Sequence, residues 1–301
     1  MKNRILIIYY SQSGQLKQIA ENFASPFLQN QVEVDWLPIE PEKPFDFPWS
    51  GKSFFDAMPE SVMGIPAPLK KIVLKNHVYN LVIFAYSPWF LSPSIPATSI
   101  LNQAEIQKLL KNTPVVTLIG SRNMWIMAQE KIKALLKNAG ANLVGNIVLE
   151  DKHTNLISAI TIQYWMFTGK KDKFLNLFPK PGVSSEDIQS TTRFGEIVLK
   201  ALVKQDFAHL QTELLQEGAV KVHPNLLFIE SRGSMLFGIW AKIISSKKNR
   251  ELWLKIFKYY LVIALFLLSP IVVILYMFII KPLSFSKTRK DIDFYSGINS
   301  L

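Results

Sequence analysis

The chain has 301 residues, 49% hydrophobic and 19% charged, a composition that predicts a folded protein rather than a disordered one. It contains no cysteine, which excludes disulfides, thiolate metal sites and a cysteine nucleophile, and its four histidines are too scattered to indicate a zinc site. The formal net charge is +11, and residues 242–290 hold ten basic residues against one acidic residue. Because these basic residues flank an apolar segment, they favour an anionic membrane surface as partner and disfavour nucleic acid.

Short apolar runs alternate with amphipathic stretches through the first half of the chain. The apolar runs cover residues 4–10, 32–39, 80–86, 114–120 and 142–149. Helical spacing of apolar residues is found at 16–27, 99–110 and 125–138. Five strands that alternate with helices predict an α/β fold, in which a doubly wound parallel sheet is covered by helices on both faces.

The sequence also divides into a predicted globular domain and a C-terminal membrane-anchoring region. We expect the domain to cover residues 1–217, with an aromatic insertion at 44–68 and a further helix that starts after Ser184 or Ser185. The remainder is expected to comprise a linker with an amphipathic basic helix, a membrane segment and a basic tail, at residues 218–258, 259–280 and 281–301.

A polar loop joins the first predicted strand to the first predicted helix. Its residues are Ser11, Gln12, Ser13, Gly14, Gln15 and Leu16. Backbone amides at a helix N-terminus bind phosphate and a glycine permits close approach, although many strand-to-helix junctions also use small polar residues. The run from Ile7 to Ala20 resembles the flavodoxin signature, which implies a flavodoxin-like sheet and flavin mononucleotide (FMN) as cofactor. Leu16 stands where that signature has a threonine, so one phosphate hydrogen bond is expected to be lost.

Two further loops follow the third and fourth predicted strands, at the edge of the sheet where such folds bind ligands. The resemblance to flavodoxin-like reductases implies that these loops wall the flavin ring. The candidate residues are Ser87 and Trp89 in the first loop, and Ser121, Asn123 and Trp125 in the second. Each tryptophan is a candidate to stack on the ring; the alternative is that both pack in the core or at its rim.

A narrower resemblance rests on the opening Tyr10–Leu16, the aromatic run Pro44–Glu60 and a length near 300 residues. In these features the chain resembles the flavodoxin-like enzymes of dialkylresorcinol biosynthesis, the pathway of flexirubin-type bacterial pigments. That family has been described both as a condensing enzyme and as the aromatase that oxidises a dialkylcyclohexanedione to the resorcinol. The absence of cysteine disfavours condensation, because the usual condensing enzyme carries its acyl group on a thiol. The resemblance also implies a ketosynthase of the same pathway as a partner.

Aromatising a cyclic dione removes two electrons and two protons, which suits a flavin together with a protein group that takes a proton. Arg122 is the candidate to hold an enolate oxygen or a charged flavin edge, although a loop arginine is often a surface residue. Tyr86 and His153 are the candidate bases, although both positions also suit structural roles. The aromatic insertion would wall a site for a lipid-like substrate or would form a small core of its own.

Residues 259–280 carry no charge and are numerous enough for a helix to cross the hydrocarbon core of a membrane. The stretch before them, around Met235 and Trp240, is expected to lie on the membrane surface or to pack on the domain. Basic residues on both sides orient a span only weakly, and Ser269-Pro270 permits a re-entrant hairpin, so both topologies stay open with the single span preferred. In the absence of a secretion signal, we expect the catalytic domain in the cytoplasm.

Three functions stay open at this point. The preferred one is a membrane-anchored FMN-dependent oxidoreductase that aromatises a lipid-like dialkylcyclohexanedione to a dialkylresorcinol. The second is a flavin-dependent quinone reductase or electron carrier at the membrane. The third is a non-enzymatic scaffold whose loop no longer binds flavin.

Overall fold

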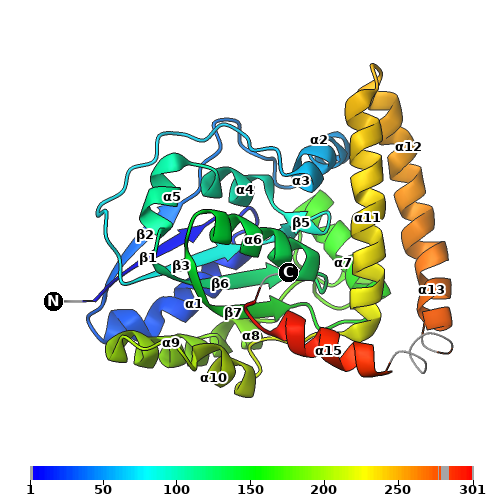
Figure 1. Cartoon of the computed structure of the whole chain (residues 1–301). Helices are drawn as coiled ribbons and strands as arrows, with labels where there is room; N and C mark the ends of the chain where they lie inside the picture. Colours follow the sequence, from blue (N-terminus) through cyan, green and yellow to red (C-terminus); the bar gives the residue numbers. More distant parts are fainter. Residues whose placement is uncertain (1–2, 277, 279–284, 300–301) are drawn as a thin grey trace.

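The computed structural model describes residues 3–276, 278 and 285–299, and its centre is a five-stranded parallel sheet (Figure 1). The strands are β1 (Arg4–Tyr9), β2 (Glu33–Pro38), β3 (Leu81–Tyr86), β6 (Pro114–Ser121) and β7 (Asn142–Glu150). They are ordered β2-β1-β3-β6-β7, and every neighbouring pair is parallel. This order reverses direction between β1 and β3, which is the flavodoxin-like doubly wound arrangement. The predicted α/β fold class is therefore confirmed.

Helices cover both faces of the sheet because successive strand residues point to opposite sides. Ile5 and Ile7 of β1 join one apolar cluster, and Leu6 and Ile8 join the other. The helices on the first face are α1 (Gln15–Gln29), α8 (Ser185–Ser190), α9 (Thr192–Lys204) and α10 (Leu210–Gln216). Those on the second face are α4 (Ile95–Leu101), α5 (Ala104–Leu110) and α6 (Ile126–Asn138). Figure 1 shows the first group below the sheet and the second above it.

The helix expected at 99–110 is two helices, because Gln103 adopts an extended backbone between α4 and α5. A second difference is a two-stranded ribbon, β4 (Pro88–Trp89) and β5 (Ser92–Pro93), directly after β3. The aromatic insertion contains α2 (Gly51–Asp56) and α3 (Met58–Met63). The side chain of Ser50 accepts a hydrogen bond from the Ser53 amide and so caps α2. After β7 the chain forms α7 (Asn155–Thr168) and the short turn η1 (Phe174–Asn176).

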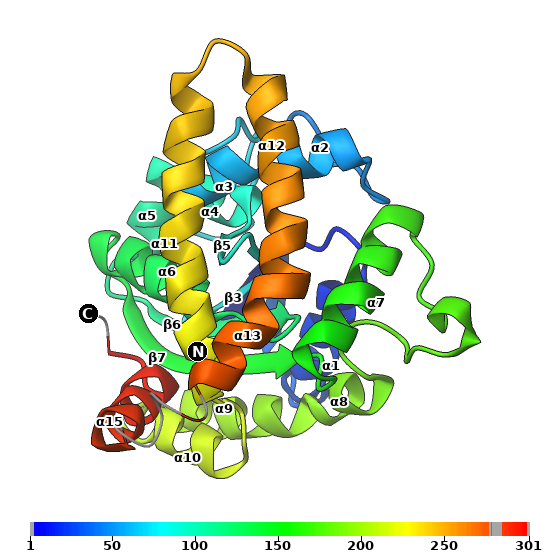
Figure 2. The same ribbon diagram turned by 90° about the vertical axis from the view of Figure 1, so that its right-hand side faces the viewer.

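The C-terminal part contributes long helices to one side of the domain. They are α11 (Pro224–Ser246), α12 (Arg250–Ile263), η2 (Ala264–Leu268), α13 (Ser269–Leu275) and α15 (Phe285–Ser296). In Figure 2, α12 and α13 form one continuous rod beside α11, and we call this pair the helical hairpin (residues 224–276). The amphipathic helix expected before the membrane segment is the second half of α11.

The rod passes through Ser269-Pro270 without turning back, so the re-entrant hairpin considered at this dipeptide does not form there. Proline lacks the N–H for an α-helical hydrogen bond, and the π-helical turn η2 directly before it absorbs the irregularity. Among the described residues, the helix over 250–275 is long and apolar enough to cross a membrane, and 6% of its most apolar 18-residue stretch is buried. The predicted segment ends beyond this point, and residues 277 and 279–284 lie outside the described part of the chain.

Candidate functional site

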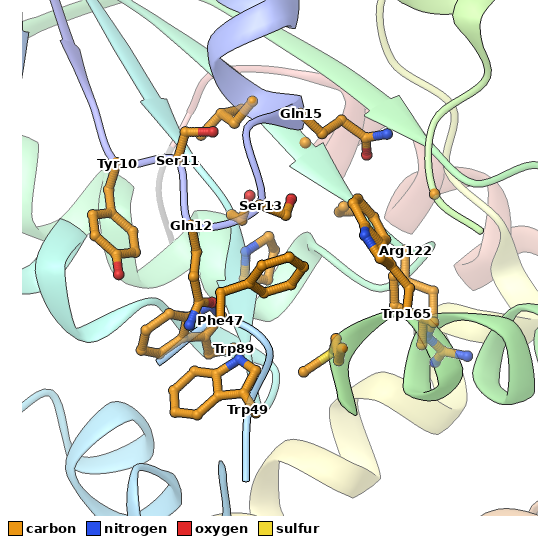
Figure 3. Close-up of a pocket in the computed structure, with 18 of the residues that line it drawn as sticks. Tyr10, Ser11, Gln12, Ser13, Gln15, Phe47, Trp49, Trp89, Arg122 and Trp165 are labelled. Carbon is orange, nitrogen blue, oxygen red and sulfur yellow. The ribbon is translucent and has the colours of Figure 1, made fainter. Parts of the chain in front are cut away.

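A cavity of about 250 Å³ lies where β1, β3 and β6 end, between the loops that follow these strands, the aromatic insertion and α7 (Figure 3). Because the strand order reverses between β1 and β3, this is the crevice in which doubly wound folds bind ligands. The sequence-predicted residues that line it are Ser11, Gln12, Ser13, Gln15, Leu16, Ser87, Trp89, Ser121 and Arg122. The structure therefore gathers residues from three separate loops into one site.

The polar end of the cavity is the loop before α1. Gly14 is the N-cap of α1 with a φ of 84°, a left-handed conformation that favours glycine, and it has no side chain with which to cap the helix. The hydroxyl of Ser11 accepts a hydrogen bond from the Lys17 amide at 3.1 Å. Within the described part of the chain, no group accepts a hydrogen bond from the amides of Gln12, Ser13 or Gln15. These donors, with the positive end of the helix dipole, suit an anion such as a phosphate group.

The two glutamines of this loop have side chains that are already engaged. Gln12 donates from Nε2 to the carbonyl of Asp46 at 2.6 Å, and so ties the loop to the aromatic insertion. The side chain of Gln15 exchanges two hydrogen bonds with the backbone of Val183, at 3.1 and 3.2 Å. Their side chains therefore hold the loop in shape, while their backbone amides stay available. Leu16 is 4% exposed, and its side chain packs in the core beneath the loop.

Tryptophans from three segments wall the apolar end of the cavity. The rings of Trp49 and Trp89 meet edge to face, with centroids 5.2 Å apart, and Trp165 of α7 lies across the cavity from them (Figure 3). The Trp49 amide donates to the carbonyl of Met166 at 2.8 Å, which fixes the insertion to α7. The insertion forms a small apolar cluster and also lines the cavity through Phe47, Trp49 and Phe54. The expected small core is therefore present, whereas binding of a lipid-like substrate stays a prediction.

Arg122 lines the cavity, but its guanidinium is used inside the protein. Nη1 donates to the carbonyl and side-chain oxygens of Asn155, both at 2.9 Å, and to the Ser158 hydroxyl at 3.3 Å. Burial, opposed by the charges of Asp151 and Glu230, lowers the pKa of Arg122 to about 10, so it stays a cation at neutral pH. This side chain therefore positions the loop after β6 against α7. The expected contact with an enolate stays a prediction, since Arg122 also lines the cavity.

Several predicted residues do not reach the cavity. Tyr86 is fully buried, donates to Gln129 Oε1 at 2.8 Å, and has a pKa well above its ordinary value because of burial, so it does not serve as a base. His153 is exposed and lies outside the cavity lining. Trp125 is 2% exposed in the core of the second face and does not line the cavity, where ring stacking had been expected. Gly14 and Asn123 also lie outside the lining.

Sequence reasoning missed part of the site. The additional lining residues are Tyr10, Ile19, Pro88, Phe90, Gly120, Ile162, Trp165, Met166 and Gly182. The run of α7 is conspicuously aromatic and apolar in the sequence, but it has no spacing that indicates which side faces a ligand. Gly182 reaches the site because its amide donates to the buried carboxylate of Asp151 at 3.1 Å. That contact joins residues far apart in the chain, which a local pattern does not reveal.

One buried acid lies behind the loop that follows β6. Glu230 of α11 is 1% exposed, and its Oε1 accepts the Met127 amide at 2.8 Å, at the otherwise uncapped N-terminus of α6. Burial, opposed by amide hydrogen bonds and by the charge of Arg122, raises the pKa of Glu230 to about 8. The helical hairpin is thus joined directly to the loop region that contributes Ser121 and Arg122 to the cavity.

No protein-family model and no curated protein sequence matches the chain. Solved structures with similar folds include a Lactobacillus acidophilus flavoprotein in complex with FMN, at 15% identity and a TM-score of 0.38, covering 49% of this chain and 93% of that one. They also include an archaeal flavodoxin, at 11% identity and a TM-score of 0.37, covering 66% of this chain and 99% of the other. RosB with a bound riboflavin-phosphate intermediate scores 0.37 at 11% identity, covering 76% and 86% of the two chains. At these TM-scores the matches carry no functional argument. The strand order defines a flavodoxin-like α/β protein, and its cavity has aromatic walls and lies beside the N-terminus of α1.

Proposed function

We propose that this chain is an FMN-dependent oxidoreductase that acts on an apolar, lipid-like ring. The observation that carries the proposal is the N-terminus of α1, which opens into a tryptophan-walled cavity. Among the described residues, no group accepts from the amides of Gln12, Ser13 or Gln15 there, and the hydroxyls of Ser11 and Ser13 lie beside them. The cavity lies where the winding of the sheet reverses, which is where FMN binds in flavodoxin-like folds. The resemblance of the loop to the flavodoxin signature points to the same cofactor.

The residues present fit a flavin phosphate and ring. The amides of Gln12, Ser13 and Gln15 would hold the phosphate, and the loss of a threonine at Leu16 removes one side-chain donor only. The hydroxyl of Ser121 is buried at the cavity without a hydrogen-bond partner among the described residues, so it is free to contact a polar ring edge. Trp89 and Trp165 would flank the ring.

A bound flavin would supply the acceptor for the two electrons that leave the substrate ring. Among the described residues that line the cavity there is no carboxylate and no histidine, and burial raises the pKa of Tyr10 to about 12. The described lining residues therefore offer no side chain that acts as a base at neutral pH. A cyclic 1,3-dione does not need one for its first ionisation, because its enolate is stabilised by two carbonyl groups. The proton of that ionisation would pass to solvent, and the second proton would leave a ring carbon together with the two electrons.

These properties support the particular reaction that the narrower resemblance implies. In it, a dialkylcyclohexanedione loses two electrons and two protons and becomes a dialkylresorcinol. Phe47, Trp49 and Phe54 would contact the alkyl chains, since aromatic walls favour such ligands. The substrate would come from a ketosynthase of the same pathway, and the domain would act from the cytoplasmic side of the membrane.

The lack of a base in the cavity equally favours a second candidate, a flavin-dependent quinone reductase or electron carrier. The two differ in what reduces the flavin. Under anaerobic conditions the aromatase flavin should lose its visible absorbance on addition of the dione without any other donor. A quinone reductase should be bleached by a nicotinamide donor and not by the dione.

The cofactor proposal is tested by titrating the detergent-solubilised full chain with FMN and following its visible absorbance. Ser13→Asp would put a negative charge beside the phosphate, so we expect at least a tenfold weaker affinity, or about 1.4 kcal/mol. Thr212→Asp, at an exposed position on α10, is the matched control and should bind like the wild type. No FMN uptake by the wild-type protein would support the scaffold alternative. Equal FMN affinity of the Ser13→Asp and Thr212→Asp variants would show that the phosphate does not bind at the loop before α1.

A further inference from the structure

The helical hairpin exposes one continuous apolar face. Large apolar residues recur at helical spacing along the rod and are between 36% and 61% exposed. They are Leu252, Ile256, Tyr259, Val262, Ile263, Phe266, Leu267, Leu268, Ile271, Val272, Ile274 and Leu275. On α11 they are continued by Met235, Leu236 and Ile239. We call this set the outer face. It is far more apolar than the surface of an ordinary soluble domain, so it needs a partner.

The opposite side of the rod is packed on the protein. Phe257 is fully buried between α11 and the insertion, with ring centroids 5.6 Å from Phe237 and 6.2 Å from Phe55. Tyr276, at the far end, is 5% exposed and stacks on Phe228 at 4.8 Å. The rod therefore lies along the side of the domain over its whole length and does not project away from it (Figure 2).

Both flanks of the apolar segment are fixed to the same domain. Before it, α11 is held to α6 by Glu230. After it, the carbonyl of Ser296 accepts from Gln211 of α10 at 2.8 Å, and that of Asn299 accepts from the buried Lys133 of α6 at 2.8 Å. A single crossing would place these two flanks on opposite sides of the bilayer. The fold described here does not permit that arrangement.

We infer that the outer face docks in the plane of an anionic lipid bilayer, as a monotopic anchor rather than a transmembrane span. Interfacial helices bury an apolar face at the headgroup boundary and use basic residues to bind anionic headgroups. The loop end of the hairpin has the matching charge. The exposed lysines there are Lys242, Lys247, Lys248, Lys255 and Lys258. A second copy packed in parallel on this face would bring these lysines against one another, so like-charge repulsion disfavours a parallel dimer as the occupant.

Docking in this orientation also brings the cavity close to the lipid. Phe90 lines the cavity and contacts Phe237 of α11 at 6.4 Å between ring centroids, and its neighbour Leu91 approaches Gly233 of the same helix. The hairpin thus packs on the loop that walls the apolar end of the site. The docking surface and the apolar end of the site are therefore parts of one packed unit; a role of docking in substrate supply rests on the proposed function, whereas the docking itself requires no flavin.

The first test measures binding of the full chain to vesicles of phosphatidylcholine, with and without one quarter phosphatidylglycerol, by flotation. We expect tighter binding to the anionic vesicles. Ile263→Glu combined with Ile271→Glu should weaken partitioning at least tenfold, while thermal unfolding and FMN uptake in detergent stay unchanged. Val203→Glu, at a 64% exposed apolar position on α9, is the matched control and should bind like the wild type. If the double variant bound the anionic vesicles as tightly as the wild type, the proposal that the outer face docks on lipid would be overturned.

The second test separates the in-plane arrangement from a span. Since the chain has no cysteine, single spin labels can be placed at Leu252, Ile263 and Ile274, all on the outer face, and their depths measured in vesicles. In-plane docking predicts similar, shallow depths at all three positions. A maximum at Ile263 with shallow ends would establish a span and overturn the proposal. So would failure of the wild-type chain to bind vesicles together with a doubled mass in solution, which would identify a second copy as the occupant.

Discussion

The sheet and the helical hairpin use the same residue types in opposite ways. Ile5, Ile7 and Ile8 in β1 are fully buried, whereas Ile263 and Ile274 in the rod are 52% and 55% exposed. Apolar residues in the strands stabilise the domain by leaving water, but those of the outer face gain this stabilisation only when something outside the chain covers them. Hydrophobicity of the sequence therefore reports a core in one region and a binding surface in the other.

We expect the largest difference between the two regions when a glycine is replaced by alanine, because the packing around the glycine decides whether the added methyl group fits. A Cβ at Gly195 of α9 would clash with the carbonyl oxygen of Phe23, where α9 crosses α1, whereas a Cβ at Gly238 of α11 would meet open space. We expect Gly195→Ala to lower the free energy of unfolding by about 3 kcal/mol. Gly238→Ala should raise it by about 0.5–1 kcal/mol, because alanine favours a helix. Urea denaturation in detergent measures both, and equal effects would contradict the contrast in packing.

The free energy of unfolding should depend on pH through Glu230, which joins the helical hairpin to α6. The pKa of Glu230 is raised from 4.5 to about 8, so between these values the folded protein holds a proton that the unfolded chain has released. Stability should therefore fall as pH rises through this window, by up to about 1.4 kcal/mol per pH unit. Glu230→Gln should remove this slope, whereas Glu217→Gln, at an exposed position on the end of α10, should keep it. Denaturation midpoints collected across the window would contradict this assignment if wild type and Glu230→Gln changed in parallel.

The sequence predicted the sheet well because each strand is a short apolar run whose burial is decided locally. It also predicted the position of the loop around Ser13, because an apolar strand, a glycine and a helix start follow one another in the sequence; phosphate binding by this loop stays a prediction. It failed where distant segments meet. Trp125 and Trp89 occupy equivalent loops, but the first turns into the core and only the second walls the cavity. The contribution of Trp165 and the docking of α15 on Lys133 through Phe294 likewise depend on tertiary contacts that leave no periodic signal.

The last prediction concerns Arg122, and it separates a residue that builds the site from one that acts in it. Its Nη1 contacts with Asn155 and Ser158 join the loop after β6 to α7, and its Nη2 contacts Met124 Sδ at 3.6 Å. A lysine has one nitrogen for all of these contacts. We expect Arg122→Lys to lower the free energy of unfolding by about 1–2 kcal/mol and to leave FMN affinity within about threefold of wild type. Arg232→Lys, at an exposed position on α11, should change neither quantity. If Arg122 instead held a substrate enolate, the variant would keep its stability and lose turnover, so measuring denaturation and turnover on the same preparation distinguishes the two roles.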